Sequence, residues 1–215
     1  MVNYKYLIFD IDGTLTDSKE GILNSFKYAL LKYGIKCDNV PLDIVGPPLK
    51  DSFMKLFNFS EKDAIDAVAF YRERFLKHGI TQENRLYDGI YELVYDLKNK
   101  GYILITASSK PEEQCKIIMD YFNLSKHFDA VFGASLDSSR ASKDKVIEYA
   151  ISKMGIKDKN DAVLIGDTRY DLIGAKKVGI DAISVSYGYG EKEELKEYES
   201  IAILDSVNDL RNYLL

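Results

Sequence analysis

The sequence has little cysteine, no long apolar run and no excess of positive charge. Cys37 and Cys115 are the two cysteines among 215 residues, which is too few for a disulfide framework and typical of a reducing compartment. No apolar stretch approaches the roughly 20 residues that a membrane-spanning helix needs. Basic residues number 29 against 34 acidic ones, a net charge of −5, so we expect neither a nucleic-acid polymer nor a membrane as partner.

The sequence also lacks a histidine metal-binding pattern and a secretory signal. His78 and His127 lack the spacing of metal ligands, so we expect both to be structural. The segment before Asp10 is too short and too soon acidic for a secretory signal, which favours a cytoplasmic protein. A hydrophobic fraction of 46% is ample for a core, and the length suits one large domain or one domain with an insertion. We expect a monomer or a weak homodimer.

The stretch from Tyr6 to Thr16 is the most informative part of the chain. Four apolar or aromatic residues predict a buried strand, and Asp10 and Asp12 follow it with one residue between them. Because side chains alternate along a strand, both carboxylates can face the same side, where they would repel unless a cation lies between them. A hard cation such as Mg²⁺ suits carboxylate and phosphate oxygens. Gly13 then allows a tight turn or a close approach of the backbone to a ligand.

Residues 16–83 contain helical apolar patterns and no strand pattern. One helix is predicted from Lys19 to Tyr33, a second around Phe53, and a third from Ser60 to about His78. Between the first two, Pro47 and Pro48 stiffen a loop or a helix start. Because this segment follows a buried strand directly, we predict an all-helical cap (16–83) inserted into an α/β domain (1–15 and 84–215).

The rest of the chain alternates strands with helices, which predicts a parallel sheet flanked by helices. Expected strands cover residues 102–107, 130–132, 162–165, 181–185 and 201–204. Parallel strands place their carboxyl ends at one edge of the sheet, so polar residues that follow these strands should converge. Those residues are Asp10, Asp12, Ser108, Ser109 and Asp167, together with Asp171 four residues further on and Lys143 at the start of a helix.

This set of residue types suits phosphoryl transfer. One carboxylate can act as nucleophile and form an aspartyl-phosphate, and a neighbouring one can exchange protons with the leaving oxygen and with water. Further carboxylates can hold Mg²⁺, while a hydroxyl, a lysine and backbone N–H groups stabilise the phosphate oxygens.

Each assignment has a plainer alternative. Ser108 could simply cap a helix, and Thr106 is a competing hydroxyl, although it lies inside its strand. Lys143 could be a solvated lysine, and Lys110 and Lys145 compete with it for the same role. Asp171 could be an ordinary acidic residue in a first helical turn.

With these residues in this order, nearly the whole chain resembles the haloacid dehalogenase superfamily of phosphatases. Asp10-Ile11-Asp12-Gly13-Thr14 is similar to its first motif, Ser108 to its second, Lys143 to its third, and Gly166-Asp167 with Asp171 to its fourth. The resemblance implies a Rossmann-like core with a helical cap.

The resemblance also implies roles for these residues. Asp10 would be the nucleophile and Asp12 the general acid and base. Mg²⁺ would be held by the Asp10 side chain, the Asp12 backbone carbonyl and Asp167, with Asp171 in support. Gly13, Ser108, Ser109 and Lys143 would contact the phosphate.

Within the superfamily, the helical cap is similar to the phosphoglycolate phosphatase branch. The stretches at 46–49, 170–175 and 187–190 are most similar to its 5′-nucleotidase-like subgroup. Two departures stand out. Asp88 replaces a proline that is common between Tyr87 and Gly89, and Lys143 is not followed by the proline found in phosphoglycolate phosphatases proper.

The expected function is therefore Mg²⁺-dependent hydrolysis of a small soluble phosphate monoester, either a nucleoside monophosphate or a phosphoglycolate-like compound. Lys50, beside the proline loop, is the expected cap residue on the substrate, with a solvated lysine as the alternative. A phosphomutase on the same scaffold, a phospho-accepting receiver domain for signalling and a binding protein with an inactive site are the competing hypotheses. The helical insertion and the Asp-x-Asp spacing argue against the receiver.

Overall fold

The computed structural model describes residues 4–137 and 139–215. The chain forms two compact units: Met1–Asp17 with Leu86–Leu215, here called the core unit, and Ser18–Arg85, here called the helical unit. Where the chain passes from one unit to the other, two short strands, β2 (Thr16–Asp17) and β3 (Arg85–Leu86), pair with each other. The helical unit is therefore an insertion between two segments of the core unit.

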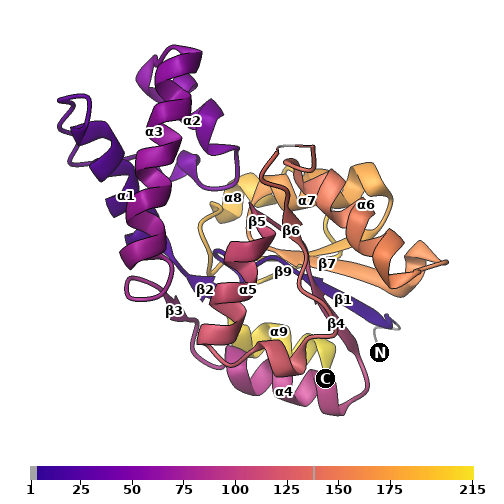
Figure 1. Cartoon of the computed structure of the whole chain (residues 1–215). Helices are drawn as coiled ribbons and strands as arrows, with labels where there is room; N and C mark the ends of the chain where they lie inside the picture. Colours follow the sequence, from indigo (N-terminus) through magenta and orange to yellow (C-terminus); the bar gives the residue numbers. More distant parts are fainter. Residues whose placement is uncertain (1–3, 138) are drawn as a thin grey trace. The chain divides into compact units, whose positions relative to one another are not determined.

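A five-stranded parallel sheet forms the centre of the core unit (Figure 1). Its strand order is β4 (Ile103–Thr106), β1 (Tyr6–Phe9), β7 (Ala162–Gly166), β8 (Asp181–Val185) and β9 (Ala202–Leu204). Tyr6 on β1 is in register with Ile103 on one side and Ala162 on the other. The rest of β1 is completely buried, which explains its unbroken apolar sequence. This parallel α/β architecture confirms the predicted fold class.

Helices pack on both faces of this sheet. They are α4 (Ile90–Asn99), α5 (Glu112–Tyr121), α6 (Lys143–Met154), α7 (Arg169–Val178), α8 (Lys192–Leu195) and α9 (Val207–Leu214). Figure 1 shows α6 and α7 on one face of the sheet and α4 and α9 on the other. Val146 and Leu172 join α6 and α7 to Ile8 and Leu164 of the sheet in one apolar cluster. This packing fixes where α6 and α7 begin.

A second, two-stranded sheet differs from the sequence prediction. The strand expected at residues 130–132 is replaced by β6 (Gly133–Ala134), which pairs with β5 (Ser108–Pro111), while Ala130 makes only an isolated bridge to Ile105. The Thr106 hydroxyl explains the difference, because it donates to the carbonyl oxygen of Phe132 and accepts from its N–H, both at 2.9 Å. The side chain thus takes up the Phe132 N–H, while the Phe132 carbonyl oxygen also accepts from the Ser108 N–H at 3.3 Å.

The helical unit consists of α1 (Lys19–Leu31), a 3₁₀ turn (Leu42–Ile44), α2 (Leu49–Phe57), α3 (Glu61–Arg74) and a π-helical turn (Phe75–Gly79). The α3 helix begins as predicted, with the Ser60 hydroxyl accepting from the Asp63 N–H at 3.1 Å. The interior is aromatic: Phe26 stacks on Phe53 with ring centroids 4.4 Å apart, and both rings are completely buried. These rings form the core of the unit itself.

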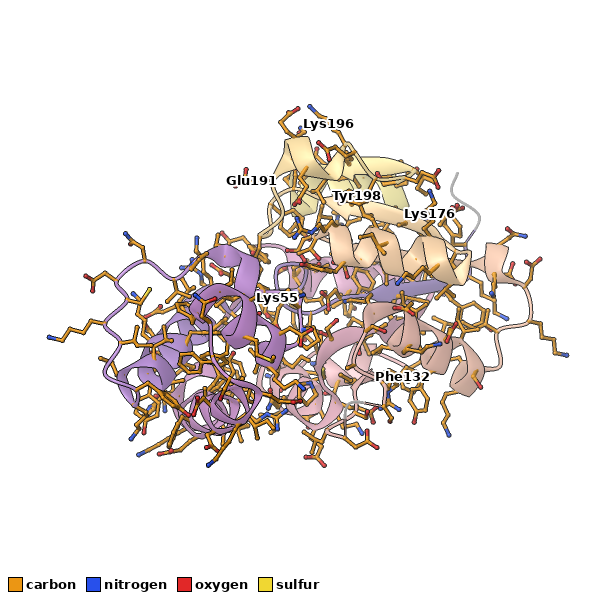
Figure 2. All side chains as sticks on the ribbon, turned by 90° about the horizontal axis from the view of Figure 1, so that it is seen from above. Lys55, Phe132, Lys176, Glu191, Lys196 and Tyr198 are labelled. Carbon is orange, nitrogen blue, oxygen red and sulfur yellow. The ribbon has the colours of Figure 1, made fainter. Side chains whose placement is uncertain are left out.

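The charged residues that follow Gly190 lie at the surface. Glu191 and Lys196 lie at the periphery in Figure 2, at the two ends of α8. Leu195 between them is completely buried. Within residues 4–137 and 139–215, no helix has the length and apolar character that crossing a membrane requires.

Candidate active site

Three carboxylates converge at the carboxyl edge of the parallel sheet. Asp10 follows β1 and Asp167 follows β7, and these strands are neighbours, so the two residues emerge side by side. Asp171 lies in the first turn of α7. One carboxylate oxygen from each residue lies within 4.8 Å of the other two. Asp10 is 8% exposed and the other two are completely buried, so these carboxylates belong to the interior of the core unit and not to its solvated surface.

Lys143 bridges two of these carboxylates. Its Nζ lies 2.9 Å from Asp10 Oδ1 and 2.7 Å from Asp171 Oδ1, and it donates to the carbonyl oxygen of Ala107 at 2.9 Å. Burial alone would lower the pKa of Lys143, but the two negative charges outweigh it and hold that pKa above its usual value. A Cβ at position 174 would come within 2.7 Å of Lys143 Cγ, so Gly174 on α7 makes room for this side chain.

Backbone and hydroxyl donors orient the remaining carboxylate oxygens. Asp167 Oδ1 accepts from the Thr14 hydroxyl at 3.1 Å, and its Oδ2 accepts from the Tyr189 N–H at 2.8 Å. Asp171 Oδ2 accepts from the Thr168 N–H at 3.0 Å and from the Thr168 hydroxyl at 2.8 Å. Asp171 is thus part of a capping box at the start of α7 and also a partner of Lys143. It is both an acidic residue of a first helical turn and a member of the carboxylate cluster.

The electrostatics of the cluster favour a cation. Burial raises the pKa of Asp10 to about 6; the charge of Lys143 opposes this rise and that of Asp171 adds to it. Burial, together with Asp171 and Asp10, raises the pKa of Asp167 well above its usual value. Together with Asp12, the cluster has four carboxyl groups against two lysines, which is an excess of acidic groups. A divalent cation would remove this excess, and an all-oxygen donor set fits the hard cation Mg²⁺.

Asp12 and Gly13 complete the loop after β1. The Asp12 side chain is 13% exposed and forms an ion pair with Lys110, whose Nζ lies 2.9 Å from Asp12 Oδ2. Gly13 has a φ of +84°, and a Cβ there would lie 2.0 Å from Asp167 Oδ2. The Gly13 N–H donates to the carbonyl oxygen of Thr16 at 2.8 Å. The visible contribution of Gly13 is therefore the absence of a side chain, which lets Asp167 approach.

The other candidates occupy different surroundings. Ser108 is 2% exposed at the start of β5, where its hydroxyl accepts from the Lys110 N–H at 3.3 Å, and Ser109 follows it, partly exposed. Lys145 is an exposed residue of α6 that pairs with Glu148 at 2.9 Å. Lys50 lies on α2 of the helical unit, 42% exposed and 2.9 Å from Glu61, so it already has an ionic partner on α3.

Sequence reasoning missed several contributors to this arrangement. Thr14 resembles any turn threonine, and the donor from Tyr189 is a backbone group, which carries no residue-type signal. The available signal was Gly188 and Gly190, where a Cβ would meet the side chain and the carbonyl oxygen of Asp167 at 2.4 Å and 2.1 Å. Lys110 was weighed as a competitor of Lys143, whereas the structure brings both lysines to carboxylates of this edge.

Comparison with known proteins is consistent with this geometry. Residues 7–185 match the family model described as haloacid dehalogenase-like hydrolase. The chain is 38% identical to a 5′-nucleotidase from Pseudomonas aeruginosa, over 99% of this chain and 96% of that protein. It is 34% identical to the tyrosine-protein kinase PtkA of Mycobacterium tuberculosis, over 97% of this chain and 72% of that one. A predicted phosphatase from Clostridium acetobutylicum superimposes with a TM-score of 0.93 at 45% identity, with 98% of each chain covered.

Proposed function

The chain belongs to the haloacid dehalogenase-like hydrolases and is a phosphatase of that family, and we propose that it hydrolyses a small phosphate monoester with Mg²⁺ through an aspartyl-phosphate. The observation that carries the proposal is the buried cluster of Asp10, Lys143, Asp171 and Asp167, with Asp12 two residues after Asp10. Buried, crowded carboxylates destabilise a fold unless a ligand uses them.

Two roles are assigned to the carboxylates of the first loop. A carboxylate oxygen of Asp10 attacks phosphorus, the bond from phosphorus to the ester oxygen breaks, and Asp12 gives that oxygen a proton. Water then attacks the phosphorus of the aspartyl-phosphate and Asp12 takes up its proton. The bond to Asp10 breaks, and inorganic phosphate leaves. Asp12 thus ends the cycle in the state in which it began.

The remaining residues bind and orient. Lys143 and the Ser108 hydroxyl lie at the carboxyl edge where phosphate oxygens would be held, and Ser109 adds a second donor there. Asp10, Asp167 and the Asp12 backbone carbonyl would hold Mg²⁺, with Asp171 supporting. When bound, the ion would offset the negative charge of the phosphate and of the carboxylates.

We propose a nucleoside monophosphate as the substrate in preference to phosphoglycolate. The P. aeruginosa relative is named a 5′-nucleotidase, and the absence of proline after Lys143 points in the same direction. Because the core residues contact groups common to all phosphate esters, the leaving group would be selected by the helical unit. Lys50 is the candidate for that contact. It would have to exchange Glu61 for the substrate, which is feasible because exposed ion pairs contribute little.

The test is phosphate release from a panel of nucleoside monophosphates, phosphoglycolate and an aryl phosphate, measured with and without Mg²⁺. We expect turnover only with Mg²⁺ and the highest kcat/KM for a nucleotide. Conversion of a sugar phosphate to its isomer without release of phosphate would instead identify a phosphomutase. Equal activity in a chelator would contradict the metal dependence.

A further inference from the structure

Lys110 is the second lysine of the site, and the proposed function leaves it without a role. Its side chain is 7% exposed, and its Nζ lies 2.9 Å from Oδ2 of Asp12, which is itself 13% exposed. Lysine is rarely buried without a reason, because removing the charge from water costs several kcal/mol unless a partner compensates. By comparison, Lys145 remains at the surface with Glu148.

The backbone around Lys110 is fixed from several sides. Lys110 lies on β5, which pairs with β6, and the following Pro111 favours an extended conformation for it. Its N–H donates to Ser108 Oγ at 3.3 Å, and its carbonyl oxygen accepts from Cys115 Sγ at 3.4 Å. A Cβ at Gly133 would lie 2.6 Å from that carbonyl oxygen, so β6 can approach only because position 133 is glycine. The side chain therefore extends from a rigid anchor.

The two lysines contact different carboxylates of the site. Lys143 contacts Asp10 and Asp171, whereas Lys110 contacts Asp12. The Lys110 ion pair engages Oδ2 of Asp12 and so restricts where that carboxylate can lie. Proton transfer requires donor and acceptor within hydrogen-bond reach, and a displacement of about 1 Å can cost 10²-fold in rate.

We infer that Lys110 is a positioning residue that holds the Asp12 carboxylate where it can exchange a proton with the leaving oxygen. This inference rests on the proposed function and adds a residue to it. The competing possibility is that Lys110 binds the phosphate group directly and meets Asp12 only incidentally. The two possibilities differ in which substrates and which inhibitors are affected when the lysine is removed.

The experiment uses the full chain with Mg²⁺ and a series of substituted phenyl phosphates whose phenols differ in acidity. Poor leaving groups need a proton from Asp12, whereas nitrophenolate hardly needs one. For Lys110→Met we expect kcat/KM to fall about 10²-fold with the least acidic phenol and about 10-fold or less with nitrophenol. The inhibition constant of inorganic phosphate should stay within about 2-fold of wild type. Lys145→Met, which also removes a lysine charge, should leave both quantities unchanged.

A double-mutant cycle separates the two possibilities further. If Lys110 acts through Asp12, Lys110→Met should slow Asp12→Asn by no more than about 2-fold, because the group that it positions is already inactive. Lys110→Arg keeps the charge with a different reach and should recover part of the lost rate. If Lys110→Met fails to fold, the Lys110→Arg variant can replace it in the experiment, because arginine keeps a positive charge beside the Asp12 carboxylate. A crystal structure of either variant should show the Asp12 side chain displaced.

The outcomes are distinct. An equal loss for all leaving groups, a raised inhibition constant for phosphate, or additive effects with Asp12→Asn would each overturn the positioning role and leave the proposed function intact. If the wild type released no phosphate from any member of the series, or if Asp10→Asn were as active as wild type, the proposed function would fail and this inference with it.

Discussion

The two compact units of this protein both bury apolar side chains, but they differ in the charged groups that they bury. In the parts of the chain that the structure describes, the buried lysine and aspartates all belong to the core unit, at Asp10, Lys143, Asp167 and Asp171. The helical unit buries aromatic rings, and its Lys50–Glu61 pair is exposed. Burying rings stabilises a fold, whereas burying like charges destabilises it. The core unit therefore carries a cost in stability that the helical unit does not, and that cost lies where the chemistry is proposed.

The largest effect should come from the nucleophile. Asp10→Asn replaces a carboxylate with an amide that is a poor nucleophile and a weak Mg²⁺ ligand. We expect kcat to fall on the order of 10⁴-fold or more for every ester, measured as phosphate release. Asp120→Asn, an exposed residue of α5, is the matched control and should retain full activity. Substantial phosphate release by the Asp10 variant would assign the chemistry to another group.

Asp12→Asn should have the next largest effect. Turnover should drop about 10²–10⁴-fold, the usual contribution of a general acid and base. Affinity for Mg²⁺, measured by calorimetry, should change little, because the proposed ligand at this residue is its backbone carbonyl. Parallel loss of metal affinity and activity would argue that the side chain binds the ion instead.

The buried carboxylates should make the stability of the metal-free protein depend on pH. Burial raises the pKa of Asp10 from 3.8 to about 6. The folded protein therefore binds a proton at Asp10 more tightly than the unfolded chain does, and protonation of Asp10 stabilises the fold. That stability is fully present below pH 4 and is lost as the pH rises through 6, by up to about 3 kcal/mol. Mg²⁺ should therefore raise the melting temperature more at pH 7.5 than at pH 5. In Asp167→Asn this difference should shrink; an undiminished shift would place the ion elsewhere.

A pair of glycines tests the contrast between the units directly. Gly13 and Gly34 both have positive φ, but a Cβ at position 34 meets nothing within 4 Å, whereas one at position 13 collides with Asp167. Gly34→Ala should cost about 1–2 kcal/mol of unfolding free energy, the price of a left-handed backbone alone, with unchanged kcat. Gly13→Ala should cost more and should also lower activity. If chemical denaturation gave the same loss of unfolding free energy for both variants, Asp167 would have moved aside to accommodate the Cβ at position 13.

The smallest effect is expected at Lys50. Lys50→Ala removes an exposed ion pair, which contributes little to stability, so the melting temperature should barely change. If Lys50 selects the leaving group, kcat/KM should fall for nucleoside monophosphates but not for a minimal aryl phosphate. Uniform effects on all esters would remove Lys50 from substrate selection.

The sequence predicted those features that depend on side-chain pattern. The apolar run of β1 indicated a strand buried on both faces, and the strand ends indicated that Asp10, Asp167 and Asp171 would meet. It could not predict the position of β6, because the Thr106 hydroxyl takes up the Phe132 N–H that backbone pairing would otherwise use. The Tyr189 N–H and the Lys110–Asp12 pair depend on which loops meet in space, and local sequence does not encode this.

Asp171 couples the architecture of α7 to the charge balance of the site. One oxygen caps the helix through Thr168, and the other holds Lys143. A substitution at this position would therefore register twice in a mutational scan, once as reduced abundance of folded protein and once as reduced turnover per folded molecule. Such a residue has little freedom to drift, because a change that one task tolerates still damages the other. Among the residues of this edge, position 171 should consequently be the hardest to redesign.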